Sequence, residues 1–170
     1  MLMRIGHGFD VHKLVTKEEY LKYHPDRTDQ KFKLAGLEIE HGKLLLGHSD
    51  ADVVIHALCD ALLGAAAQRD IGFHFPDTDK SFSGINSLIL LEKVLVIIKK
   101  DNYQISNIDI TIMAEKPKLS EHIPKMIETL AKILKIENNQ LNIKATTTEK
   151  LGFVGREEGI AVEAVCLLTK

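Results

Sequence analysis

The feature that most constrains the fold is the alternation, along the chain, of segments with strand periodicity and segments with helix periodicity. The two-residue repeat of strands occurs in residues 4–11, 104–114, 142–148 and 159–168. The apolar spacing of helices begins at Ser49 or Asp50, at Asn86, and at Ser120 or Glu121. This alternation predicts an α+β (α-β) two-layer sandwich, in which a mostly four-stranded mixed sheet carries helices on one face.

The remaining segments predict connections of two kinds. Residues 32–40 alternate around Gly36, which is typical of a small hairpin, whereas residues 14–30 and 70–83 are polar and predict loops. At 170 residues the chain is long enough for one domain with a substantial core, so we expect residues 1–170 to form a single domain. A sheet with one uncovered face usually buries that face against a partner, which favours an oligomer.

Composition excludes several functional classes. The net charge of −2 provides no basic surface for nucleic acid or an anionic membrane. Glu92 and Lys93 interrupt the most apolar window, so we expect no membrane span, and the first residues are too polar for a signal peptide. Cys59 and Cys166 lie in apolar stretches and are expected to be buried thiols. A soluble, cytoplasmic protein is the expectation.

A candidate metal site begins in the segment GHGFDVH. If this segment is a strand, Asp10 and His12 project from the same face, where they form either part of a metal site or an ordinary hydrogen-bonded pair. His56, in the first helical segment, is the candidate third ligand; alternatively it is a buried histidine bonded to a backbone carbonyl. Three ligands would leave a coordination position open, as in a catalytic zinc site. Cys59 is better explained as a packed residue than as a fourth ligand.

Three further clusters suggest phosphate chemistry. His48, Ser49 and Asp50 precede a helix and form either an anion site or a simple cap. The stretch KATTTEKLGFVGR, residues 144–156, offers hydroxyls, a carboxylate suited to magnesium and a glycine turn with an arginine. Carboxylates in residues 70–79 either bind sugar hydroxyls or shape turns. No serine or cysteine has an evident paired base, so a metal-assisted phosphate reaction without a covalent intermediate is indicated.

Four motifs in order carry a resemblance to a known family: GHGFDVH, HSDADVVIHALCDALLGA, DIGFHFPDTD and KATTTEKLGFVGR. The chain resembles the 2-C-methyl-D-erythritol 2,4-cyclodiphosphate synthases of the non-mevalonate isoprenoid pathway over nearly its whole length. The resemblance implies a homotrimer with active sites between adjacent subunits. It also implies that 4-diphosphocytidyl-2-C-methyl-D-erythritol 2-phosphate is cyclised, because its 2-phosphate oxygen attacks the β-phosphorus and CMP leaves.

The resemblance also implies roles for individual residues. Asp10, His12 and His56 match the zinc ligands, and Glu149 matches the ligand of a second ion, magnesium or manganese. His48 and Thr147 match residues that stabilise the transition state. Residues 114–120 match the cytidine-binding stretch. The substrate contacts implied in this way are Asp10, His12, His48, Ser49, Asp70, Ile71, Gly72, Phe75, Pro76, Asp77, Thr78, Asp79, Ala114, Glu115, Lys116, Pro117, Lys118, Leu119, Ser120, Thr146, Thr147, Thr148, Glu149, Phe153 and Arg156.

Two departures from the family pattern and two rival functions stay open at this point. Residues 13–31 are longer than the family usually shows and lie outside every motif, so they are expected to affect surface geometry rather than chemistry. Cys59 stands where the family often has a hydroxyl. The rivals are a metal-dependent phosphohydrolase, in which water attacks, and a non-catalytic trimer that binds a metal or an isoprenoid phosphate.

Overall fold

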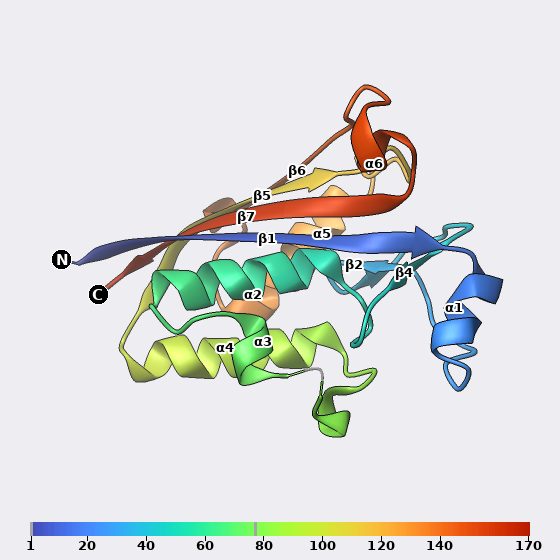
Figure 1. Ribbon diagram of the computed structural model, residues 1–170. Helices are drawn as coiled ribbons and strands as arrows, with labels where there is room; N and C mark the ends of the chain where they lie inside the picture. The colour runs from blue at the N-terminus through green and yellow to red at the C-terminus, as the bar shows by residue number, and fades with distance from the viewer. Residues whose placement is uncertain (1, 77) are drawn as a thin grey trace.

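The computed structural model describes residues 2–76 and 78–170, and its centre is a five-stranded mixed sheet (Figure 1). The strand order is β4-β1-β7-β5-β6, and only β5 and β6 are parallel to each other. The strands are β1 (Met3–Val15), β4 (Leu44–Leu46), β5 (Gln104–Met113), β6 (Leu141–Thr146) and β7 (Gly159–Thr169). The α+β layers and the mixed sheet are confirmed.

The prediction of four strands was wrong by one. β1 continues four residues beyond its predicted end at Val11, and Lys13–Val15 pairs there with Leu44–Leu46. Three consecutive leucines show no alternation, so the sequence pattern does not reveal this strand. The predicted hairpin is confirmed as β2 (Lys33–Leu34) and β3 (Leu37–Glu38), joined through a glycine at φ 79°.

Three longer helices cover one face of the sheet (Figure 1). They are α2 (Val53–Ala65), α4 (Ser87–Lys100) and α5 (Ile123–Leu134). The predicted start of α4 is confirmed to within one residue, and Asn86 is its cap, because the side chain of Asn86 accepts from the Leu88 amide. The other two starts were wrong: α2 follows Asp52 rather than residues 49–50, and α5 starts two or three residues later than predicted.

The two predicted loops contain short helices. α1 (Lys17–Tyr23) lies within residues 14–30, and α3 (Ile71–His74) and η1 (Lys80–Phe82) lie within residues 70–83. Helices of three to seven residues are too short to show a periodic pattern, which explains why the loops were predicted. The remaining short helices are η2 (Asn138–Gln140) and α6 (Gly152–Gly155). Among the described residues, no helix is both long and apolar enough to cross a membrane.

Asp52 explains why α2 starts where it does. Its fully buried carboxylate accepts from the amides of Ala35 (2.9 Å), Gly36 (2.6 Å) and Ile55 (3.3 Å). It therefore caps the helix and fastens the hairpin to it at the same time. Burial raises the pKa of Asp52, although these hydrogen bonds oppose the shift. Asp52, rather than Ser49 or Asp50, is therefore the cap of α2, and the anion site predicted at residues 48–50 stays a prediction.

β1 separates two different environments. Gly6 and Gly8 face α2, and a Cβ on either would overlap a backbone carbonyl oxygen, that of Ala61 or of Ala57. The alternate side chains point away from the helices, so that Ile5 is 76% exposed and Phe9 is 52% exposed. The helix-facing set continues with Asp10 and His12, as predicted from strand alternation. The apolar open face, formed by Met3, Ile5, Phe9, Val11 and Val165, has no cover within this chain.

Candidate active site

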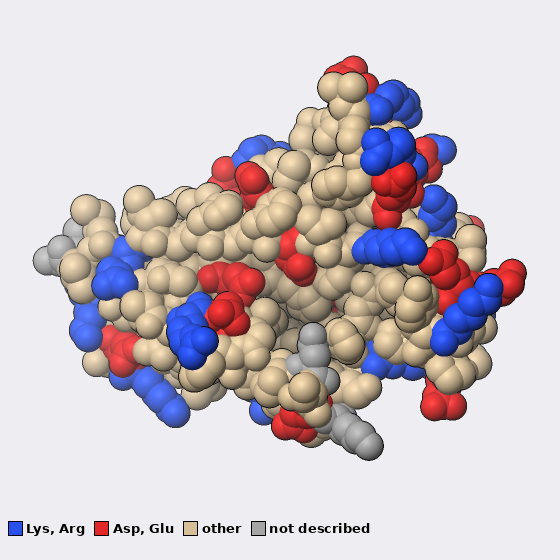
Figure 2. Space-filling view, in the orientation of Figure 1, with Lys and Arg blue, Asp and Glu red and all other residues tan. Residues whose placement is uncertain are grey.

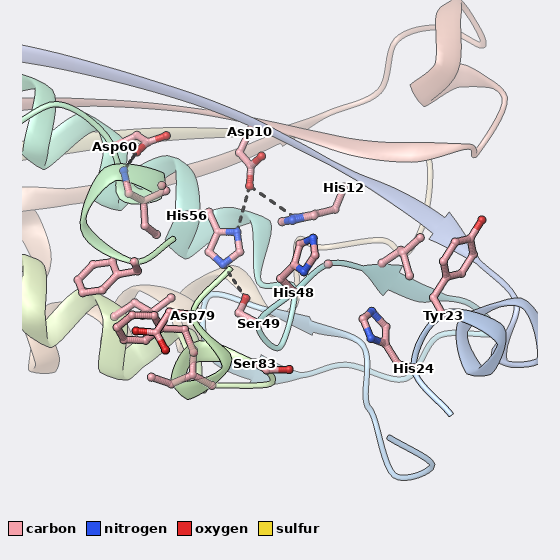
Figure 3. A pocket seen from close by; sticks show the side chains of 18 residues that line it. Asp10, His12, Tyr23, His24, His48, Ser49, His56, Asp60, Asp79 and Ser83 are labelled. Carbon is pink, nitrogen blue, oxygen red and sulfur yellow. Dashed lines mark hydrogen bonds and ion pairs between the residues drawn. The ribbon is translucent and has the colours of Figure 1, made fainter. Parts of the chain in front are cut away.

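Asp10 and His12 of β1 meet His56 of α2 beneath the sheet (Figure 3). Asp10 Oδ2 lies 3.2 Å from His56 Nδ1 and 3.5 Å from His12 Nδ1, and one candidate ligand atom from each residue lies within 4.8 Å of the others. Within residues 2–76 and 78–170, no other cluster of three His, Cys, Asp or Glu side chains has this geometry. One carboxylate and two imidazoles fit a divalent transition metal, and three ligands leave a position for an exogenous oxygen.

The electrostatic interactions among these side chains favour the binding of a cation. Burial disfavours the charged form of Asp10, but the His56 hydrogen bond and the charges of both histidines outweigh it and lower the pKa of Asp10. Burial likewise disfavours the imidazolium of His56, but the hydrogen bond and charge of Asp10, with smaller contributions from Asp52 and Asp50, raise the pKa of His56. A cation could take the place of the proton shared by this pair.

The raised pKa of His56 predicts that metal binding depends on pH. A ligating imidazole must be deprotonated, whereas Asp10 is already ionised, so binding should release a proton from His56. Below the His56 pKa, zinc affinity should rise by about tenfold for each pH unit, and above it the affinity should level off. Chelator competition between about pH 6 and pH 8, which brackets the ordinary histidine value, measures this dependence. Constant affinity across that range would contradict it.

The other ring nitrogen of His56 is held by two serines. His56 Nε2 lies 2.8 Å from Ser49 Oγ and 3.1 Å from Ser87 Oγ, while Ser87 donates a short hydrogen bond to the buried carboxylate of Asp50. Lys33 lies 3.8 Å from the same carboxylate. Such outer contacts orient a ligating histidine. Ser49 lines the cavity with its hydroxyl beside His56 (Figure 3), and its predicted contact with phosphate stays a prediction.

A cavity of about 610 Å³ opens beside this cluster. Figure 2 shows this face of the molecule hollowed between β1 and the helices below it. Several residues predicted from the motifs line the cavity together: Asp10, His12, His48, Ser49, His56, Ile71, Gly72, Phe75 and Asp79. Sequence reasoning assigned no site role to Asp60, Phe82, Ser83, Tyr23 or His24, which also line it. Asp60 stands four residues after His56 on α2, and this spacing is a signal that could have found it.

The predicted substrate loop is partly brought to the cavity. Asp70 is not among the residues that line it; it caps α3, where its side chain accepts from the Phe73 amide at 2.8 Å. Asp60 accepts from the Ile71 amide at 2.7 Å and so ties this loop to α2. Burial raises the pKa of Asp60. Pro76 and Thr78 do not line the cavity, and Asp77 lies outside the described residues.

The remaining predicted residues form a second cluster towards the opposite edge of the sheet, where β5 and β6 end. Glu115 accepts from the amides of Thr148 (3.2 Å) and Lys150 (3.4 Å), and the Ala114 amide donates to the carbonyl of Thr146 at 3.0 Å. This cluster joins residues 114–120 to residues 146–150. None of these residues lines the cavity beside His56. The structure therefore brings the predicted residues together in two groups rather than one.

Three members of the second group have distinct surroundings. The exposed Glu149 adopts a left-handed backbone with φ 52° and accepts from the Thr147 hydroxyl at 3.3 Å. Arg156 makes a two-pronged ion pair with Glu158 at 2.9 and 3.0 Å. Phe153 is 40% exposed on α6. All three are available at the surface of a single chain.

Strand register measures the separation of the two groups. Asp10, Val162, Ile112 and Ala145 form one row across β1, β7, β5 and β6. Three interstrand spacings of about 4.8 Å place Ala145 roughly 14 Å from Asp10. The hydroxyls and carboxylate of residues 146–149 begin one residue beyond that row.

Cys59 does not belong to the candidate metal cluster. It belongs to α2, its side chain is fully buried in the core, and burial raises its pKa well above the ordinary value. Cys166 is also buried, and burial raises its pKa to about 12. Both residues are free thiols that fill space in the core, as expected from their apolar neighbours.

The fold and the site together define a class: a two-layer α+β protein whose Asp-His-His cluster opens into a cavity under the sheet. The chain belongs to the YgbB family, whose family model matches residues 3–169. It is 56% identical to 2-C-methyl-D-erythritol 2,4-cyclodiphosphate synthase of Clostridium botulinum (strain Kyoto / Type A2), over 98% of this chain and 99% of that protein. The Porphyromonas gingivalis synthase of the same name is 53% identical, over 97% and 94% of the two chains.

Solved structures give the same result. The chain superimposes on the bifunctional IspDF of Campylobacter jejuni with a TM-score of 0.88 and 40% identity, covering 98% of this chain and 42% of that larger chain. It superimposes on the CDP complex of Plasmodium falciparum IspF with a TM-score of 0.80 and 35% identity, covering 98% and 95% of the two chains. The family expected from the four motifs is therefore confirmed.

Proposed function

We propose that this protein is a phosphorus-oxygen lyase of the non-mevalonate isoprenoid pathway. It converts 4-diphosphocytidyl-2-C-methyl-D-erythritol 2-phosphate to 2-C-methyl-D-erythritol 2,4-cyclodiphosphate and CMP. The observation that carries the proposal is the Asp10-His12-His56 cluster beside a cavity of about 610 Å³. Relatives that are 53–56% identical to this chain over nearly its full length carry the synthase name.

The reaction explains why no protein nucleophile is needed. An oxygen of the substrate's 2-phosphate forms a bond to the β-phosphorus, and the bond between that phosphorus and the oxygen bridging to the α-phosphorus breaks, so CMP carries away the electron pair. A phosphate is already ionised near neutral pH. The protein therefore contributes positioning and charge neutralisation, which are the main sources of catalysis in phosphoryl transfer.

The two groups of side chains contribute different parts of this positioning and charge neutralisation. Asp10, His12 and His56 would hold a divalent cation, for which the family resemblance implies zinc, and Glu149 would hold a second, magnesium or manganese. Bound cations supply positive charge to the phosphate oxygens and polarise the reacting phosphorus. His48 and Thr147 donate to the developing charge. Residues 70–79 enclose the methylerythritol part, and residues 114–120 bind cytidine.

A homotrimer with shared sites reconciles this assignment with the separation of the two groups. Within one chain, Asp10 and Ala145 lie roughly 14 Å apart along one row of residues that crosses the sheet. The cluster of one subunit would meet residues 146–149 of its neighbour. The apolar open face of β1 and β7 supports this arrangement, because exposed side chains such as Ile5 and Phe9 would be buried around the threefold axis.

A mixed-subunit experiment tests the shared site. Single His56→Ala and Glu149→Ala variants should both be inactive as homotrimers. Co-expressed with different tags, they should regain about a quarter of wild-type turnover, because that share of sites combines two intact halves in a randomly mixed trimer. Absence of activity in purified mixed trimers would mean that each site lies within one chain.

The proposed reaction itself is tested with purified protein, zinc, magnesium and 4-diphosphocytidyl-2-C-methyl-D-erythritol 2-phosphate. Equal amounts of CMP and the cyclic diphosphate, separated by ion-exchange chromatography, are expected. Linear phosphate products would favour a phosphohydrolase. Unchanged substrate with tightly bound zinc would favour a binding protein.

A further inference from the structure

The connection between α1 and β2 binds the loop that carries His48. This loop, residues 47–52, joins β4 to α2 and contains no helix or strand. The Arg27 guanidinium donates to the carbonyl oxygens of His48 (2.8 Å) and Ser49 (3.0 Å), with a longer contact of 3.5 Å to that of Gly47. Gln30 donates to the next carbonyl, that of Asp50, at 3.0 Å. Two side chains thus bind four consecutive carbonyls.

Arg27 also joins this loop to the segment before α4. Its Nη2 donates to Ser83 Oγ at 2.8 Å, and its Cζ lies 3.4 Å from the position that a Cβ on Gly84 would occupy. The Gly84 amide in turn donates to the carbonyl of His48 at 2.8 Å. The guanidinium therefore lies where two walls of the cavity meet, since His48 and Ser83 both line it.

The geometry suits arginine in particular. A guanidinium presents five donors in a rigid plane, whereas a lysine ammonium is a single point charge on a flexible chain. The loop that it binds includes Ala51, whose φ of 61° is unfavourable for alanine and has to be maintained by contacts elsewhere. Tyr23, the last residue of α1, and His24, the first residue after it, also line the cavity (Figure 3).

We propose that Arg27 is a positioning residue that holds the 47–50 loop in the conformation in which His48 and Ser49 face the reacting phosphates. The role of His48 in this statement rests on the proposed function. Residues 13–31, which lie outside the family motifs, thereby contribute to the chemistry through Arg27.

The first test measures the loop and does not depend on activity. Amide hydrogen exchange of residues 47–51 is compared in wild type, Arg27→Met, Arg27→Lys and the control Lys22→Met, whose side chain is exposed. Lys22 lies in the last turn of α1, and its exposed side chain pairs with Glu18 on the same helix rather than with residues 47–51. Exchange should become at least about tenfold faster in both Arg27 variants and remain unchanged in the control. Wild-type exchange in both Arg27 variants would overturn the proposal.

The second test is a double-mutant cycle on turnover. Arg27→Met should lower kcat by about tenfold or more, with a smaller change in KM, because contacts to the substrate outside this loop remain. In a His48→Ala background, Arg27→Met should have much less effect, since the group that it positions is gone. Arg27→Lys should recover only part of the loss. Fully additive effects would assign Arg27 a general structural role and overturn the proposal.

The two tests separate this inference from the proposed function. If wild-type protein does not form the cyclic product, the proposed function fails, while the exchange experiment still decides whether Arg27 holds the loop. If wild type is active and the cycle is additive, only the role of Arg27 is rejected.

Discussion

Replacing His56 by alanine should remove the metal and nearly all turnover while the chain still folds. The imidazole Nδ1 lies 3.2 Å from Asp10 Oδ2, so two candidate ligands meet at this point. Loss of an outer partner alone weakens metal binding by about 10–100-fold, and loss of a ligand should exceed that range. Turnover should fall by roughly a thousandfold, because a bound cation contributes several kcal/mol to neutralising the reacting phosphate.

Zinc content per chain, measured after dialysis by elemental analysis, checks the result. His122→Ala provides a matched control, because this histidine precedes α5, caps nothing with its side chain and lies outside the cluster. It should keep wild-type zinc and activity. Asp10→Asn retains the size of the side chain and should behave like His56→Ala. Stoichiometric zinc in both cluster variants would contradict the assignment of the metal site.

Replacing Gly8 by alanine should strongly destabilise the protein, because the added methyl group meets the backbone of α2. The new Cβ would overlap the carbonyl oxygen of Ala57 in α2, and a backbone atom cannot move aside as a flexible side chain can. Such overpacking should lower the free energy of unfolding by about 3 kcal/mol or more. For a domain of this size the thermal midpoint should fall by roughly 6–12 °C.

Gly42→Ala is the control for the added methyl group, because nothing lies within 4 Å of the Cβ built there. It should change the free energy of unfolding by less than about 0.5 kcal/mol. Circular dichroism melting curves compare the two variants with wild type. Equal midpoints for Gly8→Ala and Gly42→Ala would mean that β1 and α2 are not packed as closely as described here.

The long periodic elements of the fold could be predicted from sequence, but their exact starts could not. Alternation identified β1, β5, β6, β7 and the hairpin, because each buries one face. The start of α2 was misassigned because Ser49, Asp50 and Asp52 are all acceptable caps. What selects Asp52 is its contact with the amides of Ala35 and Gly36, which is a tertiary interaction.

The candidate site, like the fold, could be predicted from sequence only where a local pattern specifies it. Strand alternation alone placed Asp10 and His12 on one face, but the approach of His56 depends on Gly6 and Gly8 letting α2 lie directly on β1. The contribution of residues 23–30 could not be anticipated. The helix α1 has only seven residues, too few to show a periodic pattern. Arg27 binds backbone carbonyls, and because every residue has one, no residue type in the sequence marks its partners.

The separation of the two groups of site residues also depends on the fold. The four motifs gave no indication that residues 146–149 lie at the other side of the sheet from His56. That distance follows from β7 and β5 lying between β1 and β6, a strand order that no local pattern specifies. The family resemblance implied sites shared between adjacent subunits, and this separation supports the homotrimer proposed above.

The most direct test of the central claim is a phosphorus NMR spectrum of the products formed in ¹⁸O-enriched water with zinc and magnesium present. If the substrate's own 2-phosphate is the nucleophile, the spectrum will contain CMP and a cyclic diphosphate, and neither will carry ¹⁸O from the solvent. Incorporation of solvent ¹⁸O into linear phosphate products would show that water attacks, and the chain would then be a phosphohydrolase rather than a cyclase.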